Sequence, residues 1–184
     1  MRIFQSLGKH YIIAIVGVVA LIVILLFSNI IHMEKQSIKE GAKAPDFTLP
    51  SQDGTMVSLS QFIGKKKIVL YFYPKDESYG CTKEACSFRD NYEVFKDAGA
   101  EVIGISSDDE ASHKSFASNH KLPFVLLSDK DRKVANLYNV GKTLGVIPGR
   151  ATFVIDTDGT IRKIFSSQFS FEKHISEALE ILKK

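Results

Sequence analysis

The two cysteines of the chain, Cys81 and Cys86, are the residues best suited to chemistry. Isolated cysteines are often inert buried thiols, and a zinc site would need further ligands, yet the histidines show no ligand spacing around the pair. If both cysteines lie on one helix, five positions give a rise of ~7.5 Å and a rotation of ~140°. Their Cα atoms would then be roughly 8–9 Å apart, beyond the ~7 Å that a disulfide tolerates. The helix must therefore open before a disulfide forms, which favours a redox cycle over a static crosslink.

Cys81 has the local setting of a reactive thiol. It follows an apolar run at 68–73 and a polar loop that ends in Gly80, and it opens a predicted helix. The N–H groups and the dipole of a helix N-terminus stabilise a thiolate. Substrates of open α/β sheets bind beyond the carboxyl ends of the strands. Cys81 therefore has the position expected of an attacking nucleophile.

Arg150 precedes another apolar run, at 152–155. A single arginine is more often a surface charge than a catalytic group. If the 152–155 strand runs antiparallel to the strand at 68–73, however, its first residue lies at the same end of the sheet as Cys81. A guanidinium there would favour the thiolate and orient an oxygen substrate through its forked donors.

The apolar patterns predict the elements that position these residues. Short apolar runs at 68–73 and 102–105 flank a helical pattern at 80–97, which indicates a right-handed parallel crossover. A small hairpin precedes them at 47–59. Further elements are predicted as helices at 110–119 and 134–138, strands at 124–127, 152–155 and 161–165, and a terminal helix from 171. The prediction is an α/β fold with a mixed central sheet and helices on both faces.

The first 43 residues differ from the rest of the chain. Residues 11–31 are uncharged and apolar, and at ~1.5 Å per residue they would form a helix of roughly 30 Å, enough to span a bilayer. A cleaved signal peptide is the alternative, although 27–31 is a poor cleavage site. We therefore expect a flank at 1–10, a transmembrane helix at 11–31, a tether at 32–43 and a globular domain at 44–184. Basic residues on the two flanks nearly balance, and the short N-terminal tail favours a domain on the non-cytoplasmic face.

The net charge of +3 lies entirely in that leader. Residues 44–184 contain equal numbers of basic and acidic side chains. A neutral domain offers no general attraction for phosphate backbones, so nucleic-acid binding is not expected.

At the cysteines the sequence resembles the peroxiredoxins of the bacterioferritin-comigratory or Q type. The stretch 71–76, followed by 80–86, is similar to the active-site segment of that subfamily. The similarity continues through 99–106 and 122–124, and through 148–156, and it covers the chain from about residue 42. Several motifs occur in order, so the resemblance is specific. It implies a thioredoxin-like fold.

The resemblance also assigns roles to residues. The family pattern of a proline, a hydroxyl residue and a cysteine falls on Pro74, Ser78 and Cys81. Cys81 would be the peroxidatic cysteine, Cys86 the resolving cysteine and Arg150 the active-site arginine. Ser78 replaces the commoner threonine and keeps the hydroxyl.

Two further positions near Cys81 are less settled by the resemblance. Tyr79 stands where the family usually has proline, which could loosen the loop before the cysteine. Glu84, one helical turn after Cys81, either orients Arg150 or is a solvated helix charge.

The implied reaction is reduction of hydrogen peroxide and organic hydroperoxides. Cys81 becomes a sulfenic acid, Cys86 forms an intramolecular disulfide with it, and a thioredoxin-like donor restores both thiols. No metal, haem or flavin is needed. The expected partners are the peroxide, a dithiol reductant and, through residues 11–31, a membrane, with the domain itself monomeric.

Two alternatives use the same cysteines. A membrane-tethered thioredoxin-like oxidoreductase would share the fold, but such proteins usually carry Cys-x-x-Cys, which this chain lacks. A membrane-held redox sensor would use the same oxidation to signal. Rapid reaction with peroxide and sustained turnover with a reductant would separate the peroxidase from both.

Overall fold

A computed structural model describes residues 38–183 of the chain. The expected flank at 1–10 and the expected transmembrane helix at 11–31 lie outside these residues. Between residues 38 and 183, none of the helices has the length and apolar composition needed to cross a membrane. The last residues of the expected tether pair with the globular part: Gly41 N donates to Ile161 O, and Ile161 N donates to Ala42 O, each at 2.8 Å.

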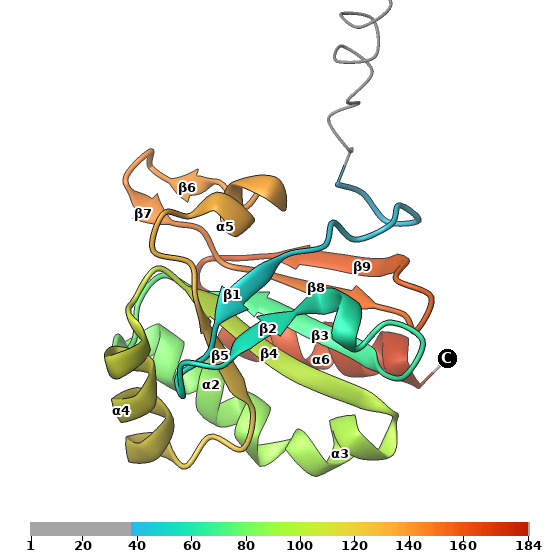
Figure 1. Cartoon of the computed structure of the whole chain (residues 1–184), viewed down its shortest axis with the longest axis horizontal. Coiled ribbons are helices and arrows are strands. Elements are labelled where there is room, and N and C mark those ends of the chain that lie inside the picture. Colours follow the sequence, from blue (N-terminus) through green and yellow to red (C-terminus); the bar gives the residue numbers. More distant parts are fainter. Residues whose placement is uncertain (1–37, 184) are drawn as a thin grey trace, which may run out of the picture. The chain divides into compact units, whose positions relative to one another are not determined.

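The central sheet of the described residues has five strands in the order β5-β4-β3-β8-β9 (Figure 1). Strands β3, β4 and β5 are parallel, β8 runs antiparallel to β3, and β9 runs antiparallel to β8. The strands are β3 (Lys67–Phe72), β4 (Ala100–Ser106), β5 (Val125–Ser128), β8 (Ala151–Ile155) and β9 (Ile161–Ser166). The predicted mixed sheet is therefore observed, and β8 runs antiparallel to β3, which is the condition on which the approach of Arg150 to Cys81 depended.

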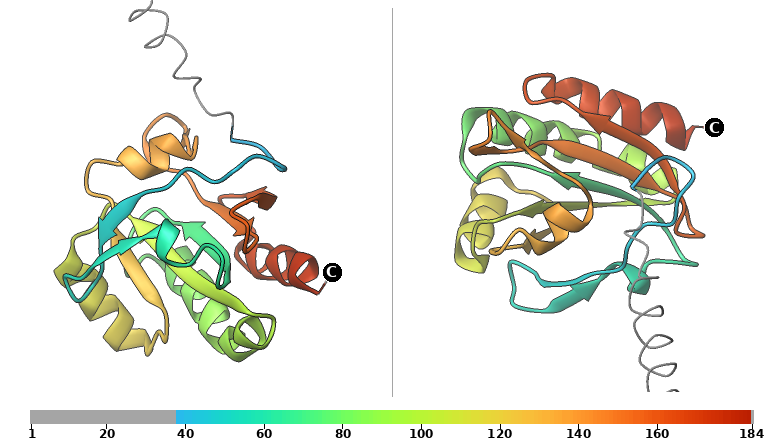
Figure 2. Two further views of the ribbon diagram at one scale, coloured as in Figure 1. Left: turned by 45° about the vertical axis from the view of Figure 1, so that its right-hand side comes forward. Right: turned by 90° about the horizontal axis from the view of Figure 1, so that it is seen from above.

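Four helices cover one face of this sheet. They are α2 (Tyr79–Asp90), α3 (Tyr92–Asp97), α4 (Glu110–His120) and α6 (Phe171–Leu182). Alternate residues of β3, Val69 and Tyr71, face them and pack with Phe88 of α2 and Ile175 of α6. In the right view of Figure 2, α6 lies on one side of the sheet and the β1–β2 hairpin on the other.

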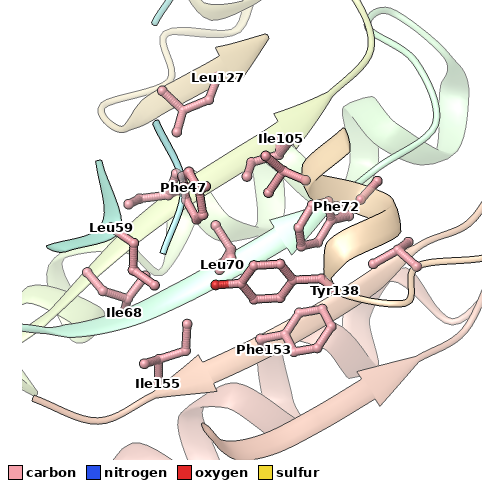
Figure 3. Packing of buried hydrophobic residues seen from close by; sticks show 14 of the residues in the cluster. Phe47, Leu59, Ile68, Leu70, Phe72, Ile105, Leu127, Tyr138, Phe153 and Ile155 are labelled. Atoms are coloured by element: carbon pink, nitrogen blue, oxygen red, sulfur yellow. The ribbon is translucent and has the colours of Figure 1, made fainter. Parts of the chain in front are cut away.

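The opposite face is covered mainly by the N-terminal hairpin, with helices taking a smaller share than the sequence suggests. The hairpin consists of β1 (Thr48–Pro50) and β2 (Met56–Ser58), and the 3-10 turn η1 (Leu59–Gln61) follows it. The helix on this face is the short α5 (Lys133–Leu137). Leu70 and Phe72 of β3 point to this side, where they pack with Tyr138 and Phe153 (Figure 3). The hydroxyl of Tyr138 donates to the carbonyl oxygen of Pro45 at 2.7 Å, which ties α5 to the chain that enters the hairpin.

Two local features differ from the sequence prediction. The single helix expected at 80–97 ends at Asp90 and resumes at Tyr92, because the amide of Asn91 donates to Ser87 O at 2.9 Å and competes with the helical backbone. A further small hairpin, β6 (Lys142–Thr143) with β7 (Ile147–Pro148), precedes β8. Its turn holds Leu144 at φ 54° and Gly145 at φ 74°. Asn-Gly is the usual sequence signal for a turn with two positive φ angles, whereas Leu-Gly does not predict one.

Candidate active site

Cys81 lies at the third position of α2 and is 1% exposed. The helix is preceded by Ser78, whose backbone is extended and whose side chain makes no capping hydrogen bond to the helix. Its hydroxyl lies instead 2.7 Å from Cys81 Sγ and 3.0 Å from the carbonyl oxygen of Lys75. The hydroxyl has one proton and donates it to one of these acceptors at a time. The first-turn N–H groups of α2, which have no intrahelical partners, are left without this side-chain cap.

Arg150 directly precedes β8, and the β3–β8 register, which pairs Phe72 with Ala151, brings it to the carboxyl end of β3. Its Nη2 lies 3.2 Å from Cys81 Sγ. The side chain is buried, and its guanidinium carbon lies 4.9 Å from the ring centroid of Phe171, at the start of α6. The geometry places a fixed cation directly against the thiol.

Glu84 fixes the other side of the guanidinium. It is 0% exposed, and its Oε2 accepts a hydrogen bond from Arg150 Nη1. Burial raises the pKa of Glu84 to about 7, even though the charge of Arg150 lowers it. Burial opposes the charge on Arg150, but Glu84 and Cys81 outweigh that effect and raise the pKa of the guanidinium. Of the two interpretations left open by the sequence, Glu84 is therefore the buried partner of Arg150 and not a solvated charge.

The loop between β3 and α2 is anchored by Asp76, which the sequence analysis did not single out. Its carboxylate is buried and accepts hydrogen bonds from the hydroxyl of Tyr73 at 2.7 Å and from Ser112 Oγ at 2.8 Å, and lies 2.8 Å from His113 Nδ1. Burial alone would raise the pKa of Asp76, but hydrogen bonding and the charge of His113 lower it overall. The carboxylate therefore stays ionised and ties the loop to α4.

His113 extends this anchor to the sheet. It is 0% exposed, and its Nε2 lies 3.2 Å from the carbonyl oxygen of Leu127 in β5. The sequence separation of 37 residues between His113 and Asp76 gives no local pattern from which their contact could be predicted.

The outer part of the loop is held less firmly. Pro74, the second residue after β3, is partly buried, and Glu77 adopts φ 57°, a left-handed conformation unusual for this residue type. Hydrogen bonds from Asn119 Nδ2 and from the ring of His120 hold its carboxylate, each at 2.9 Å. Tyr79 is 76% exposed, and the Nζ of Lys83 lies 5.6 Å from the centroid of its ring.

Cys86 lies on the same helix as Cys81, is partly exposed, and is a free thiol, as Cys81 is. The two sulfurs belong to one continuous helical segment, so their joining requires the first turns of α2 to open. In this conformation the structure shows a reduced site.

Comparison with known proteins identifies the family of this chain. The model of the AhpC/TSA family matches residues 41–164. Peroxiredoxin Q, chloroplastic, from Arabidopsis thaliana is 56% identical over 147 residues, which cover 79% of this chain and 68% of that protein. This chain belongs to the AhpC/TSA family, in its peroxiredoxin Q branch. It is a thiol-dependent peroxidase that uses a thioredoxin-like reductant.

Other relatives agree with this peroxiredoxin assignment. Peroxiredoxin Q, chloroplastic, from Oryza sativa subsp. japonica is 56% identical over 146 residues, covering 79% of this chain and 67% of that protein. The crystal structure of peroxidoxin BcpB from Mycobacterium tuberculosis is 39% identical with a TM-score of 0.74, and covers 80% of this chain and 97% of that one. A structure of Xanthomonas campestris peroxiredoxin Q is 28% identical with a TM-score of 0.71, over 81% and 97% of the two chains. The thioredoxin-like fold is confirmed.

The predicted membrane localisation is corrected by the same comparisons. The plant relatives, at 56% identity, are named as chloroplastic proteins, and no helix that could span a membrane occurs within residues 38–183. The prediction rested on the apolar run at 11–31, outside the described residues. Length and apolarity make such a run compatible with a span but do not by themselves establish where the protein resides. The single-pass location and the non-cytoplasmic face inferred from it are therefore not retained.

Proposed function

We propose that Cys81 is the peroxidatic cysteine of this peroxidase and Cys86 the resolving one, with Arg150, Ser78 and Pro74 forming the peroxide site. The observation that carries this assignment is the double contact at Cys81 Sγ, which lies 2.7 Å from Ser78 Oγ and 3.2 Å from Arg150 Nη2. Both are hydrogen-bond donors, and one is a permanent cation. Together with the start of α2 they stabilise a thiolate and can hold a second acceptor, a peroxide oxygen, beside it.

The first step oxidises Cys81. Its thiolate attacks the terminal oxygen of a hydroperoxide, an S–O bond forms as the O–O bond breaks, and the released alkoxide takes up a proton and leaves as an alcohol. With hydrogen peroxide the leaving group is water. Arg150 and Ser78 stabilise the negative charge as it moves from sulfur to oxygen. Pro74 fixes the backbone where the chain leaves β3 for the loop.

The second step joins the two cysteines. The first turns of α2 unwind, the Cys86 thiolate attacks Cys81 Sγ, and the sulfenic hydroxyl leaves with a proton as water. A dithiol donor then reduces the disulfide, is itself oxidised, and both thiols return to the helix.

The substrate range includes organic hydroperoxides. One solved relative, the bacterioferritin comigratory protein of Xanthomonas campestris, is described as having alkyl peroxide reduction activity. In this chain Phe171 stacks on Arg150, and Tyr79 and Phe169 are 76% and 80% exposed. These apolar side chains belong to segments that adjoin the peroxide site and can contact an alkyl group. The ratio of kcat/KM for cumene hydroperoxide to that for hydrogen peroxide measures this preference.

Two cysteine variants test the assignment. Cys81→Ser should lose peroxidase activity altogether. Cys86→Ser should consume about one equivalent of peroxide and then stop with a thioredoxin-type donor, leaving a sulfenic acid that mass spectrometry detects after dimedone trapping. Sustained turnover by Cys81→Ser, or a stoichiometric burst in Cys81→Ser but not in Cys86→Ser, would contradict the assignment.

A further inference from the structure

A buried histidine, His174 of α6, faces the acid that holds the active-site arginine. His174 and Glu84 are both 0% exposed, and they come from different helices. The Nδ1 of His174 lies 3.5 Å from Glu84 Oε1. Among the described residues this oxygen is one of the few buried side-chain atoms that have no hydrogen-bond partner. Because the other carboxyl oxygen binds Arg150, Glu84 lies between the guanidinium and the imidazole.

The remaining contacts of His174 define its tautomer. Nε2 lies 2.9 Å from the carbonyl oxygen of Ser167, which can only accept, so Nε2 carries a proton. Nδ1 lies 2.8 Å from the hydroxyl of Thr152. In the neutral ring, Nδ1 is then an acceptor that the hydroxyl satisfies, and the hydroxyl has no second proton for Glu84 Oε1.

One additional proton completes this hydrogen-bond pattern. With Glu84 ionised, Oε1 is a buried acceptor beside another acceptor, an arrangement that costs free energy. A proton on Oε1 lets the carboxyl compete with the hydroxyl of Thr152 for the single lone pair of Nδ1. A proton on Nδ1 lets the ring donate to Oε1 while the hydroxyl of Thr152 accepts. Either microstate removes the clash of two facing acceptors, so the proton belongs to the pair and not to one residue.

We propose that Glu84 and His174 jointly hold one exchangeable proton, and that this proton sets how strongly Arg150 stabilises the Cys81 thiolate. The inference rests on the proposed role of Cys81. With the proton bound, the pair is neutral and the full charge of Arg150 acts on Cys81 Sγ, 3.2 Å away. When the proton leaves, the Glu84 carboxylate offsets the guanidinium and the thiolate loses part of its stabilisation. His174 is thus a positioning residue that acts through Glu84 and Arg150.

The surroundings limit which groups can take part. Cys81 shares α2 with Glu84, Arg150 approaches from the start of β8, and Tyr71 faces the site from β3. Burial, followed by the charge of Glu84, raises the pKa of Tyr71 well above its usual value, so this phenol stays neutral. On the side of β9, the ring of Phe165 packs edge-on against His174, with the centroids 4.7 Å apart.

The directions of the two pKa shifts agree with the geometry. Burial raises the pKa of Glu84 to about 7 and lowers the pKa of His174 to about 4. The proton is therefore mainly on the carboxyl when it is bound, and it is exchanged close to neutral pH.

Infrared spectroscopy of the reduced full chain tests the proton directly. The C=O stretch of a protonated buried carboxyl should appear below pH 7 and disappear as the pH rises, and Glu84→Gln should remove this band. Glu93→Gln, at an exposed carboxyl of α3, is the control and should leave it. His174→Asn should move the titration to lower pH, because an amide cannot take the proton. A wild-type spectrum without a titrating carboxyl band between pH 5 and 9 would overturn the proposal.

The rate of Cys81 oxidation tests the consequence. In a Cys86→Ser background, the second-order rate constant for hydrogen peroxide should fall by roughly three- to tenfold as the pair loses its proton. Glu84→Gln should lack this step, and His174→Asn should shift it. Phe165→Leu, which changes the packing on the ring without altering any polar atom, should keep the step at its wild-type pH.

The two levels of proposal fail differently. If His174→Asn gives the wild-type pH profile scaled by a constant, His174 is merely structural and the inference is wrong, whereas the roles of Cys81 and Cys86 stand. If Cys81→Ser keeps full activity, the proposed function itself is wrong, whatever the infrared band shows. Should His174→Asn fail to fold, Thr152→Val removes the hydroxyl that competes for His174 Nδ1 and should move the step to higher pH. An unmoved step in Thr152→Val would then count against the pair.

Discussion

Arg150 is the residue on which the geometry of the peroxide site converges. One arm of its guanidinium binds Glu84, the other contacts Cys81 Sγ, and its central carbon lies over the ring of Phe171. A planar fork with several fixed donors can satisfy all three contacts, whereas a lysine ammonium is a single point charge. The requirement at this position is therefore for the shape of arginine as well as its charge.

Replacing Arg150 should separate the contribution of its charge from that of its shape. Arg150→Met removes charge and fork, and we expect kcat/KM for hydrogen peroxide to fall about 10²–10³-fold, the scale of losing one transition-state donor. Arg150→Lys keeps the charge and should recover only part of the loss. Arg162→Met, which removes an arginine from a half-exposed ion pair with Asp156, is the control in steady-state assays. Equal activity of the Arg150→Lys variant and the wild type would show that shape is not needed.

The hydroxyl of Ser78 contacts Cys81 Sγ and does not cap the helix. Because its side chain makes no capping hydrogen bond, Ser78→Ala should change helix stability little but should lower the rate of Cys81 oxidation about tenfold through the lost donor. Ser78→Thr keeps the hydroxyl and should retain most of the rate. Stopped-flow oxidation measures the rate, and urea unfolding provides the control. A large loss of stability in Ser78→Ala with an unchanged oxidation rate would point to a structural role.

At the scale of elements, the active-site loop is fastened at one end and must move at the other. Asp76 and His113 bind it to α4 and β5 through buried contacts. The first turns of α2, which follow this loop, must unwind before Cys86 reaches Cys81. The fastening therefore favours the reduced, fully helical conformation and opposes the conformation that forms the disulfide.

Loss of the contact between Asp76 and His113 should slow the reaction with peroxide and accelerate disulfide formation. His113→Leu leaves the buried Asp76 carboxylate without its main partner and should cost about 3–5 kcal/mol of unfolding free energy. The peroxide step should slow, since the site is less ordered, while disulfide formation after oxidation should accelerate. Rapid-quench thiol labelling follows the second step. His120→Leu removes a histidine from a partly exposed pair with Glu77 and should cost at most ~1 kcal/mol. Slower disulfide formation in His113→Leu would contradict the prediction.

At the scale of the whole molecule, the buried pair of Glu84 and His174 links stability to pH. Burial raises the folded pKa of Glu84 from 4.5 to about 7, so its contribution is fully present below pH 4.5 and is lost as the pH rises through 7. Burial lowers the folded pKa of His174 from 6.5 to about 4, so its contribution is present above pH 6.5 and is lost as the pH falls through 4. Between pH 4.5 and 6.5 the two slopes oppose each other.

Single substitutions should reveal the slopes that cancel in the wild type. Glu84→Gln leaves His174 alone, and the unfolding free energy should fall on acidification from pH 6.5 to 4. His174→Phe leaves Glu84 alone, and the unfolding free energy should fall as the pH rises from 4.5 to 7. One proton corresponds to a slope of at most about 1.4 kcal/mol per pH unit. Urea unfolding at a series of pH values measures both, and parallel profiles for the two variants would contradict the assignment.

The sequence by itself determined the local chemistry and the order of the elements. Cys81 at a helix start and Cys86 five positions along the same helix follow from short-range pattern, as do the strands that flank them. Helical spacing also required that the pair be reduced while the helix is intact, because that distance is set by the backbone of one element. Apolar periodicity found most strands and helices, but it missed the β6–β7 hairpin, where an unusual Leu-Gly turn holds only two residues on each side.

Only the tertiary structure decided how distant residues meet around the thiol. The antiparallel pairing of β8 with β3 brings Arg150 to Cys81, a contact that the sequence could state only as a condition. The approach of Glu84 to His174 joins two helices, and the contact of Asp76 with His113 joins a loop to a helix far along the chain. The sequence around a carboxyl or an imidazole does not predict such a partner. The protonation and role of these groups depend on desolvation and on charges that folding brings close. The positions of the two cysteines on one helix can thus be predicted from the sequence, whereas the charges around Cys81 are set by the fold.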